Sequence, residues 1–111
     1  MSIQRAWRLT VVVPIYQNNK AVQPDERFAD LETVLVERYG GFTRTNCVGQ
    51  WITDEGVVQE DEGLLYEVTT IAPRTVAEKD WELLLRRLRV LFEQEAMYGE
   101  MSDTTQFLVE D

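Results

Sequence analysis

The stretch from Gly49 to Gly63 (GQWITDEGVVQEDEG) places a tryptophan beside an acidic run bounded by glycines. Its composition fits three things: a metal loop, an acidic surface that imitates nucleic acid, or a solvated hairpin. A calcium loop needs oxygen ligands at fixed alternating offsets, a central glycine and a late bidentate glutamate, and Asp54 to Glu62 lacks that pattern. The chain also has no histidine and only one cysteine, so we predict no metal site. A hairpin facing water is the favoured interpretation.

Gln50 and Trp51 within this stretch are candidate ligand-binding residues. An aromatic ring can stack on a ligand ring while a neighbouring amide contacts the polar edge of that ligand. The alternative is that Trp51 fills the core beside a bulge at Gly49. We favour the core position, because large aromatic side chains are mostly buried.

Several carboxylates and tyrosines could act as a general acid or base. They are Glu32, Glu60, Glu67, Tyr16, Tyr66 and Tyr98. Nothing in their spacing brings two of them together, and the absence of histidine removes the usual base near neutral pH. Cys47 has no histidine partner and is expected to be a small buried hydrophobic residue. No glycine-rich phosphate loop occurs, so we predict no cofactor and favour a function without catalysis.

The apolar pattern predicts the elements that hold these side chains. Alternation from Trp7 to Tyr16 predicts a strand with one buried face, and Pro14 is expected to mark its end or a bulge. A helix is expected from Pro24, where the next two acidic residues suit the helix dipole. Gly40-Gly41 ends it. The apolar face of this helix is Phe28, Leu31, Leu35 and Tyr39.

Two strands and a second helix should follow. Phe42 to Thr53 suits a strand, and Val57 to Ala72 suits another that the acidic residues interrupt. Thr75 and Glu78 form a predicted capping box for the second helix. The apolar face of that helix is Ala77, Trp81, Leu84, Leu85, Leu88, Leu91 and Phe92.

The last part of the chain predicts two short strands, 96–101 and 105–109. The resulting order, strand, helix, strand, strand, helix, strand, indicates a single α+β domain over residues 1–111 with a ferredoxin-like arrangement. In it, two helices cover one face of an antiparallel sheet.

The open face of that sheet is the most promising binding surface. It should gather Arg8, Thr10, Val12 and Tyr16 from the first strand. The third strand adds either Glu67 and Thr69 or Tyr66 and Thr70. This face could bind a small ligand or a second copy of the chain. The alternative is a sheet face that is exposed to solvent and binds nothing.

A second apolar stripe repeats every seven residues on the second helix. Its members are Val76, Leu83, Val90 and Met97. Four such residues in register suggest a contact surface. We therefore predict a homodimer, with Val12, Leu83 and Val90 as candidate interface residues.

Three short motifs resemble a family of small uncharacterised bacterial ferredoxin-like domains. They are GG-x-T at Gly40 to Thr43, G-x-W at Gly49 to Trp51, and QEA at Gln94 to Ala96. The resemblance implies the same fold and no particular activity. In the family a glycine usually ends the helix just before QEA, whereas Phe92-Glu93 stands there in this chain.

Charge and composition limit the partners. With 20 acidic and 11 basic residues the formal charge is −9, which disfavours direct binding to nucleic acid or anionic lipid. The apolar N-terminal stretch is too short for a membrane span and lacks a signal-peptide cleavage pattern, so we expect a cytoplasmic protein. A homodimer that binds a partner or small ligand is the leading hypothesis. The alternatives are a small dimeric α+β barrel enzyme, with a carboxylate or tyrosine in a cleft, and an acidic decoy of nucleic acid.

Overall fold

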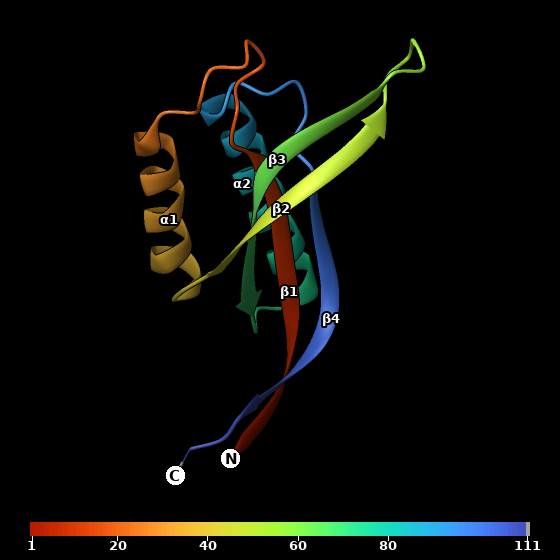
Figure 1. Ribbon diagram of the computed structural model, residues 1–111. Helices are drawn as coiled ribbons and strands as arrows, with labels where there is room; N and C mark the ends of the chain where they lie inside the picture. The colour runs from red at the N-terminus through yellow and green to blue at the C-terminus, as the bar shows by residue number, and fades with distance from the viewer. Residues whose placement is uncertain (111) are drawn as a thin grey trace.

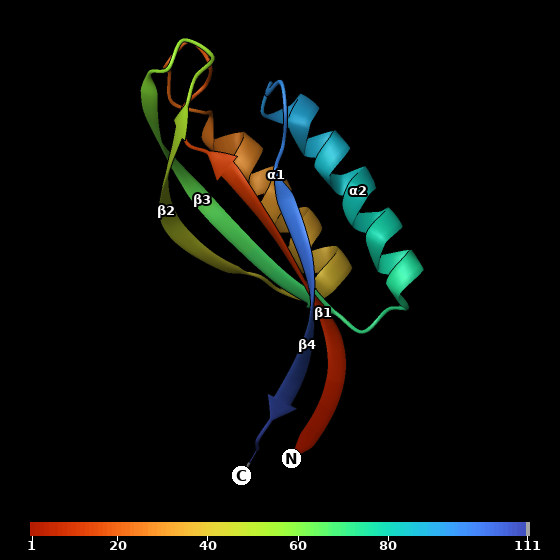
Figure 2. The same ribbon diagram turned by 90° about the vertical axis from the view of Figure 1, so that its right-hand side faces the viewer.

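The computed structural model describes residues 1–110, which form one antiparallel sheet covered on one face by two helices (Figures 1 and 2). The elements are β1 (Ser2–Pro14), α1 (Asp25–Tyr39), β2 (Thr43–Ile52), β3 (Val58–Thr70), α2 (Arg74–Leu91) and β4 (Gly99–Leu108). The strands lie in the order β2-β3-β1-β4. This confirms the ferredoxin-like α+β fold.

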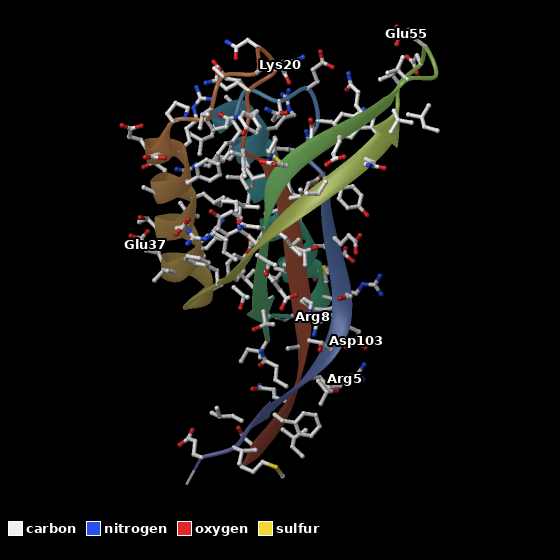
Figure 3. The ribbon with its side chains drawn as sticks, viewed as in Figure 1. Arg5, Arg8, Lys20, Glu37, Glu55 and Asp103 are labelled. Atoms are coloured by element: carbon white, nitrogen blue, oxygen red, sulfur yellow. The ribbon has the colours of Figure 1, made fainter. Side chains whose placement is uncertain are left out.

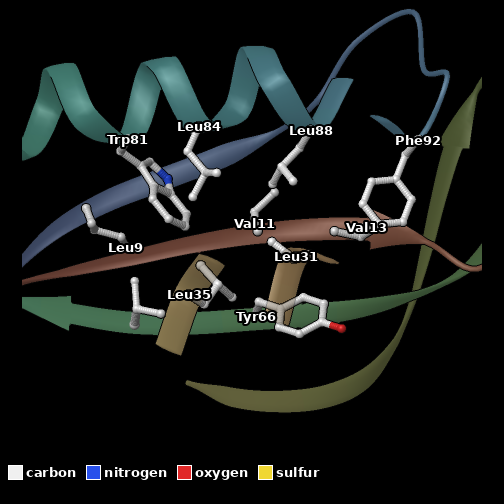
Figure 4. Packing of buried hydrophobic residues seen from close by; sticks show 11 residues of the cluster. Leu9, Val11, Val13, Leu31, Leu35, Tyr66, Trp81, Leu84, Leu88 and Phe92 are labelled. Carbon is white, nitrogen blue, oxygen red and sulfur yellow. The ribbon is translucent and has the colours of Figure 1, made fainter. Parts of the chain in front are cut away.

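The core lies between the helices and the inner face of the sheet (Figure 4). Leu9, Val11 and Val13 of β1 are buried there, because every second residue of a strand points to the same face. The predicted helix faces are confirmed: α1 buries Leu31 and Leu35, and α2 buries Trp81, Leu84 and Leu88. The indole Nε1 of Trp81 donates to the Thr10 carbonyl oxygen at 3.2 Å, which fixes α2 over β1.

The helix ends follow local chemistry, with one correction. Gly40 closes α1 with φ 82°, a conformation that glycine adopts without strain, as predicted. The predicted capping box at Thr75 is wrong. Proline at position 73 already starts the helix, and no side chain caps its N-terminus. Glu78 instead accepts a bond at 2.8 Å from Arg74, one turn earlier.

The strands differ from the prediction in three places. The register between β2 and β3 runs without a break from Thr43 opposite Glu67 to Ile52 opposite Val58, so the predicted bulge at Gly49 is wrong. The acidic residues do not interrupt β3 but lie within it. The two short strands predicted near the C-terminus are one strand, β4, because its whole length pairs with β1.

Two extensions give the molecule an elongated shape of 51 × 30 × 30 Å. At one end β1 and β4 continue together as a two-stranded ribbon, with Ser2 opposite Leu108 (Figure 1). At the other end the hairpin of β2 and β3 projects beyond the helices (Figure 2). Within residues 1–110, neither helix is both long and apolar enough to cross a membrane.

Candidate functional site

A groove opens where β1 leaves the side of β3. The paired register of these strands ends at Pro14 opposite Gly63, and the Ile15 amide makes a last bond to the Glu62 carbonyl at 3.1 Å. β3 continues toward the hairpin tip with only β2 beside it. The chain after β1 folds back on itself instead, through a bridge between Tyr16 and Val22. A notch therefore lies between β3 and the β1–α1 loop.

This groove has a volume of about 530 Å³. That volume falls in the range of about 300–1,000 Å³ that is usual for small-molecule sites. The side chains that give it its chemical character are Tyr16, Lys20, Trp51, Glu60, Asp61 and Gln94. They come from the β1–α1 loop, β2, β3 and the segment after α2, so residues distant in sequence meet here.

Two aromatic rings are partly open to solvent in the groove. Trp51 is 45% exposed and Tyr16 is 43% exposed. The expectation that Trp51 fills the core is wrong, because the hairpin arm extends past the helices and has no core to fill. Both rings are available to contact a flat ligand.

The polar groups of the groove are two carboxylates, one lysine and several side-chain amides. The Gln50 side-chain amide donates to the Glu60 carboxylate at 3.0 Å and orients it. Asp61 follows on the same strand, and Lys20 faces them from the β1–α1 loop. Figure 3 shows Lys20 in that loop and Glu55 at the tip of the hairpin. The groove thus combines carboxylates, one cation and aromatic faces.

Polar contacts, one of them buried, connect one wall of the groove to the end of α2. Gln23 is almost fully buried, donates to the Phe92 carbonyl at 3.2 Å and accepts a bond from Arg27 at 2.7 Å. Arg27 also pairs with Glu93 at 3.2 Å, and Asn18 donates to the Glu93 carbonyl. The sequence analysis missed Gln23, since an isolated glutamine carries no pattern that marks it as buried.

The open face of the sheet holds a second polar group of residues. Arg8 Nε lies 3.6 Å from a Glu67 carboxylate oxygen, and the carboxylate and Thr69 both point to this face. The predicted neighbourhood of Arg8 and Glu67 is confirmed. Neither residue lines the groove, so the candidates split into two sites: Tyr16 and Trp51 with Gln50 behind them, and Arg8 with Glu67.

Tyr66 belongs to neither site. The alternative that placed it on the open face is wrong, because its ring packs under the helices and is fully buried. Its hydroxyl donates to the Glu32 carboxylate at 2.7 Å, and Arg44 donates to the same carboxylate at 2.8 Å. Burial of the hydroxyl is the main cause of the raised pKa of Tyr66, and the neighbouring Glu32 carboxylate raises this pKa further. This cluster joins α1 to β2 and β3.

The candidate interface residues are at the surface. Val12 on the open sheet face and Leu83 and Val90 on α2 are all exposed. The predicted fourth member of the helix stripe, Met97, lies beyond the end of α2 and packs against the core. The stripe is therefore shorter than predicted. Cys47, expected to be buried, is only half-buried on β2.

Comparisons with protein-family models and with curated proteins find no match. Solved structures of a phage SAM lyase are similar to this chain. The lyase in complex with S-methyl-5′-thioadenosine superposes with a TM-score of 0.69 at 12% identity, covering 93% of this chain and 90% of the lyase. The same kind of enzyme in its apo state gives a TM-score of 0.63 at 13% identity, covering 91% and 81%. At such identities the likeness shows a shared fold.

Proposed function

We propose that this chain binds an S-adenosyl compound, S-adenosylmethionine or S-methyl-5′-thioadenosine, in the groove beside β3. The observation that carries the proposal is the meeting of Tyr16 and Trp51 with Glu60 and Asp61 in one groove of about 530 Å³. The shared fold with a SAM lyase that holds S-methyl-5′-thioadenosine supports the choice of ligand.

Each part of such a ligand has a complementary group in the groove. The purine presents a flat face to the exposed rings of Tyr16 and Trp51. Ribose hydroxyls can donate to the carboxylates of Glu60 and Asp61, which accept several bonds when ionised. The sulfonium of S-adenosylmethionine is a cation, and both carboxylates and aromatic faces attract cations.

A lyase reaction is the second candidate function, and the fold shared with a SAM lyase favours it. S-adenosylmethionine differs from S-methyl-5′-thioadenosine by its four-carbon amino acid fragment. Release of the thioether breaks the bond between sulfur and Cγ, and the bonding pair stays on sulfur, which becomes neutral. The carbon fragment must then lose a proton or take a nucleophile. Glu60 and Asp61 are carboxylates of the groove that could accept that proton.

Calorimetric titration with S-methyl-5′-thioadenosine tests the binding. We expect one saturable site, and we expect Trp51→Ala to weaken it about tenfold or more, because stacking on an aromatic ring contributes about 1–3 kcal/mol per base. Ile52→Ala is the matched control, since Ile52 is an exposed neighbour on β2 that does not line the groove. Absence of saturable binding up to about 1 mM would refute the proposal.

The lyase reaction needs its own measurement. Mass spectrometry after incubation with S-adenosylmethionine should detect S-methyl-5′-thioadenosine above the level formed without protein. Glu60→Gln and Asp61→Asn should lower the rate of release by a larger factor than they weaken binding of the nucleoside. A protein that binds the nucleoside but releases no thioether would be a binding protein only.

A further inference from the structure

Backbone hydrogen-bonding groups of β3 point into the groove. Two bonds fix their direction: the Ile15 amide donates to the Glu62 carbonyl, and the Thr53 amide donates to the Val57 carbonyl. In an antiparallel sheet, successive residues direct their backbone N–H and C=O groups alternately to the two neighbours. The backbone N–H and C=O of Glu62 therefore point toward β1, and those of Val57 point toward β2. Glu60 lies two residues from Glu62, so its backbone N–H and C=O also point to the β1 side of β3, away from β2.

No strand occupies that side at Glu60. The register that ends at Pro14 opposite Gly63 would place Gln17 opposite Glu60. The Gln17 amide instead donates to the Ala21 carbonyl at 2.7 Å, because the chain has already turned back. Among the described residues, no turn or loop bond involves the backbone of Glu60. Since Glu60 also lines the groove, its N–H and C=O are an open donor and acceptor side by side.

We propose that this free edge of β3 at Glu60 recognises the base of an adenine nucleoside. The Glu60 N–H would donate to a ring nitrogen, and its C=O would accept from the exocyclic amine. Adenine fits this arrangement because its amine is a donor flanked by ring-nitrogen acceptors on either side. The inference rests on the proposed function and names the part of the ligand that the backbone selects.

The backbone edge suits selection better than the side chains do. Aromatic faces accept any base, since every base has a flat π surface. Carboxylates accept from any hydroxyl or amine. A paired donor and acceptor rejects a base whose edge has the opposite pattern, because the polar groups that the base covers are then left unpaired. Under this proposal, the backbone N–H and C=O of Glu60 therefore determine the specificity for adenine.

A pair of nucleosides tests the inference on the unaltered protein. S-methyl-5′-thioinosine carries a carbonyl oxygen in place of the amine, which removes the donor and protonates the neighbouring ring nitrogen. We expect it to bind on the order of tenfold to a hundredfold more weakly than S-methyl-5′-thioadenosine in calorimetry. Equal affinities would overturn the inference and leave the proposed function intact. Failure of both nucleosides to bind would refute the proposed function, and the inference with it.

A pair of variants isolates the backbone donor. Glu60→Pro removes the N–H that faces the groove and leaves the bonds to β2 in place, and proline is tolerated where a strand has no neighbour on its N–H side. Glu60→Ala is the matched control, because it removes the same carboxylate and keeps the N–H. We expect the proline variant to bind S-methyl-5′-thioadenosine about threefold to tenfold more weakly than the alanine variant.

Circular dichroism and thermal melting show whether both variants are folded. Equal affinity in two folded variants would overturn the role of the Glu60 N–H. If the proline variant does not fold, the comparison of the two nucleosides on the unaltered protein still decides the inference.

Discussion

Truncation of Leu88 to alanine is the sharpest test of the core. Leu88 is 1% exposed and lies on α2 between Leu84 and Phe92, above Val11 of β1 (Figure 4). The change removes three buried carbon atoms. At about 0.8 kcal/mol for each, the lost burial costs about 2.4 kcal/mol. The cavity left behind adds to this loss, so we expect a decrease of about 2–5 kcal/mol in the free energy of unfolding.

Leu83→Ala is the matched control for this test. Leu83 lies on the same helix but is 51% exposed. Leucine and alanine are both strong helix formers, so the change in helix propensity is small and equal in the two variants. We expect Leu83→Ala to change the free energy of unfolding of the monomer by no more than about 0.5 kcal/mol. Urea denaturation of both variants measures the difference. A loss at Leu88 no larger than the loss at Leu83 would refute the packing of α2 on β1.

Three further predictions concern other parts of the molecule. Gly99→Ala should destabilise the protein by about 1–3 kcal/mol in thermal melts, because an added Cβ would lie 2.8 Å from a β1 carbonyl oxygen and 2.9 Å from a leucine of α2; Gly41→Ala, with open space around it, is the control. The raised pKa of Tyr66 means that the folded chain keeps a proton that the unfolded chain loses above about pH 10, so stability is present below that pH and falls above it. Tyr66→Phe should make this alkaline decline shallower in denaturation curves measured at several pH values, and an unchanged decline would contradict the assignment. We also propose that the chain self-associates through the surface of Val12 or of Leu83, so Val12→Glu or Leu83→Glu should yield monomers in light scattering, and a wild-type monomer at about 100 μM would refute it.

The fold could be predicted because the spacing of apolar residues in the long helices and strands indicates directly which residues are buried. On α2, Trp81, Leu84 and Leu88 repeat at three and four residues, and all three are buried. On β1, Leu9 and Val11 alternate with exposed or half-buried neighbours. Local pattern and tertiary contact agree in these elements, so the pattern alone is sufficient.

The groove could not be predicted, because it depends on how far β3 extends beyond the end of the neighbouring strand β1. Trp51 was expected in the core on the strength of its residue type, yet it lies on an arm that extends past the helices. The open backbone at Glu60 exists only because β1 turns back after Pro14 while β3 continues. The position of Trp51 and the open backbone at Glu60 both depend on the relative lengths of the elements, and not on the types of the residues that line the groove. The sequence identified Tyr16 on the first strand and Gln50 together with Trp51 in the acidic stretch, but not that Tyr16 and Trp51 share one groove.

The free edge of β3 also gives a physical reason for the acidic run. An unpaired strand edge is a template for pairing with another chain, and natural proteins protect such edges with charged side chains. Glu60, Asp61 and Glu62 place carboxylates on both faces of β3, where it extends beyond β1. A second strand would have to bring its own backbone past these charges along several residues. A nucleoside needs the donor and acceptor of one residue only, so the same charges that oppose strand addition leave the edge open to a small ligand.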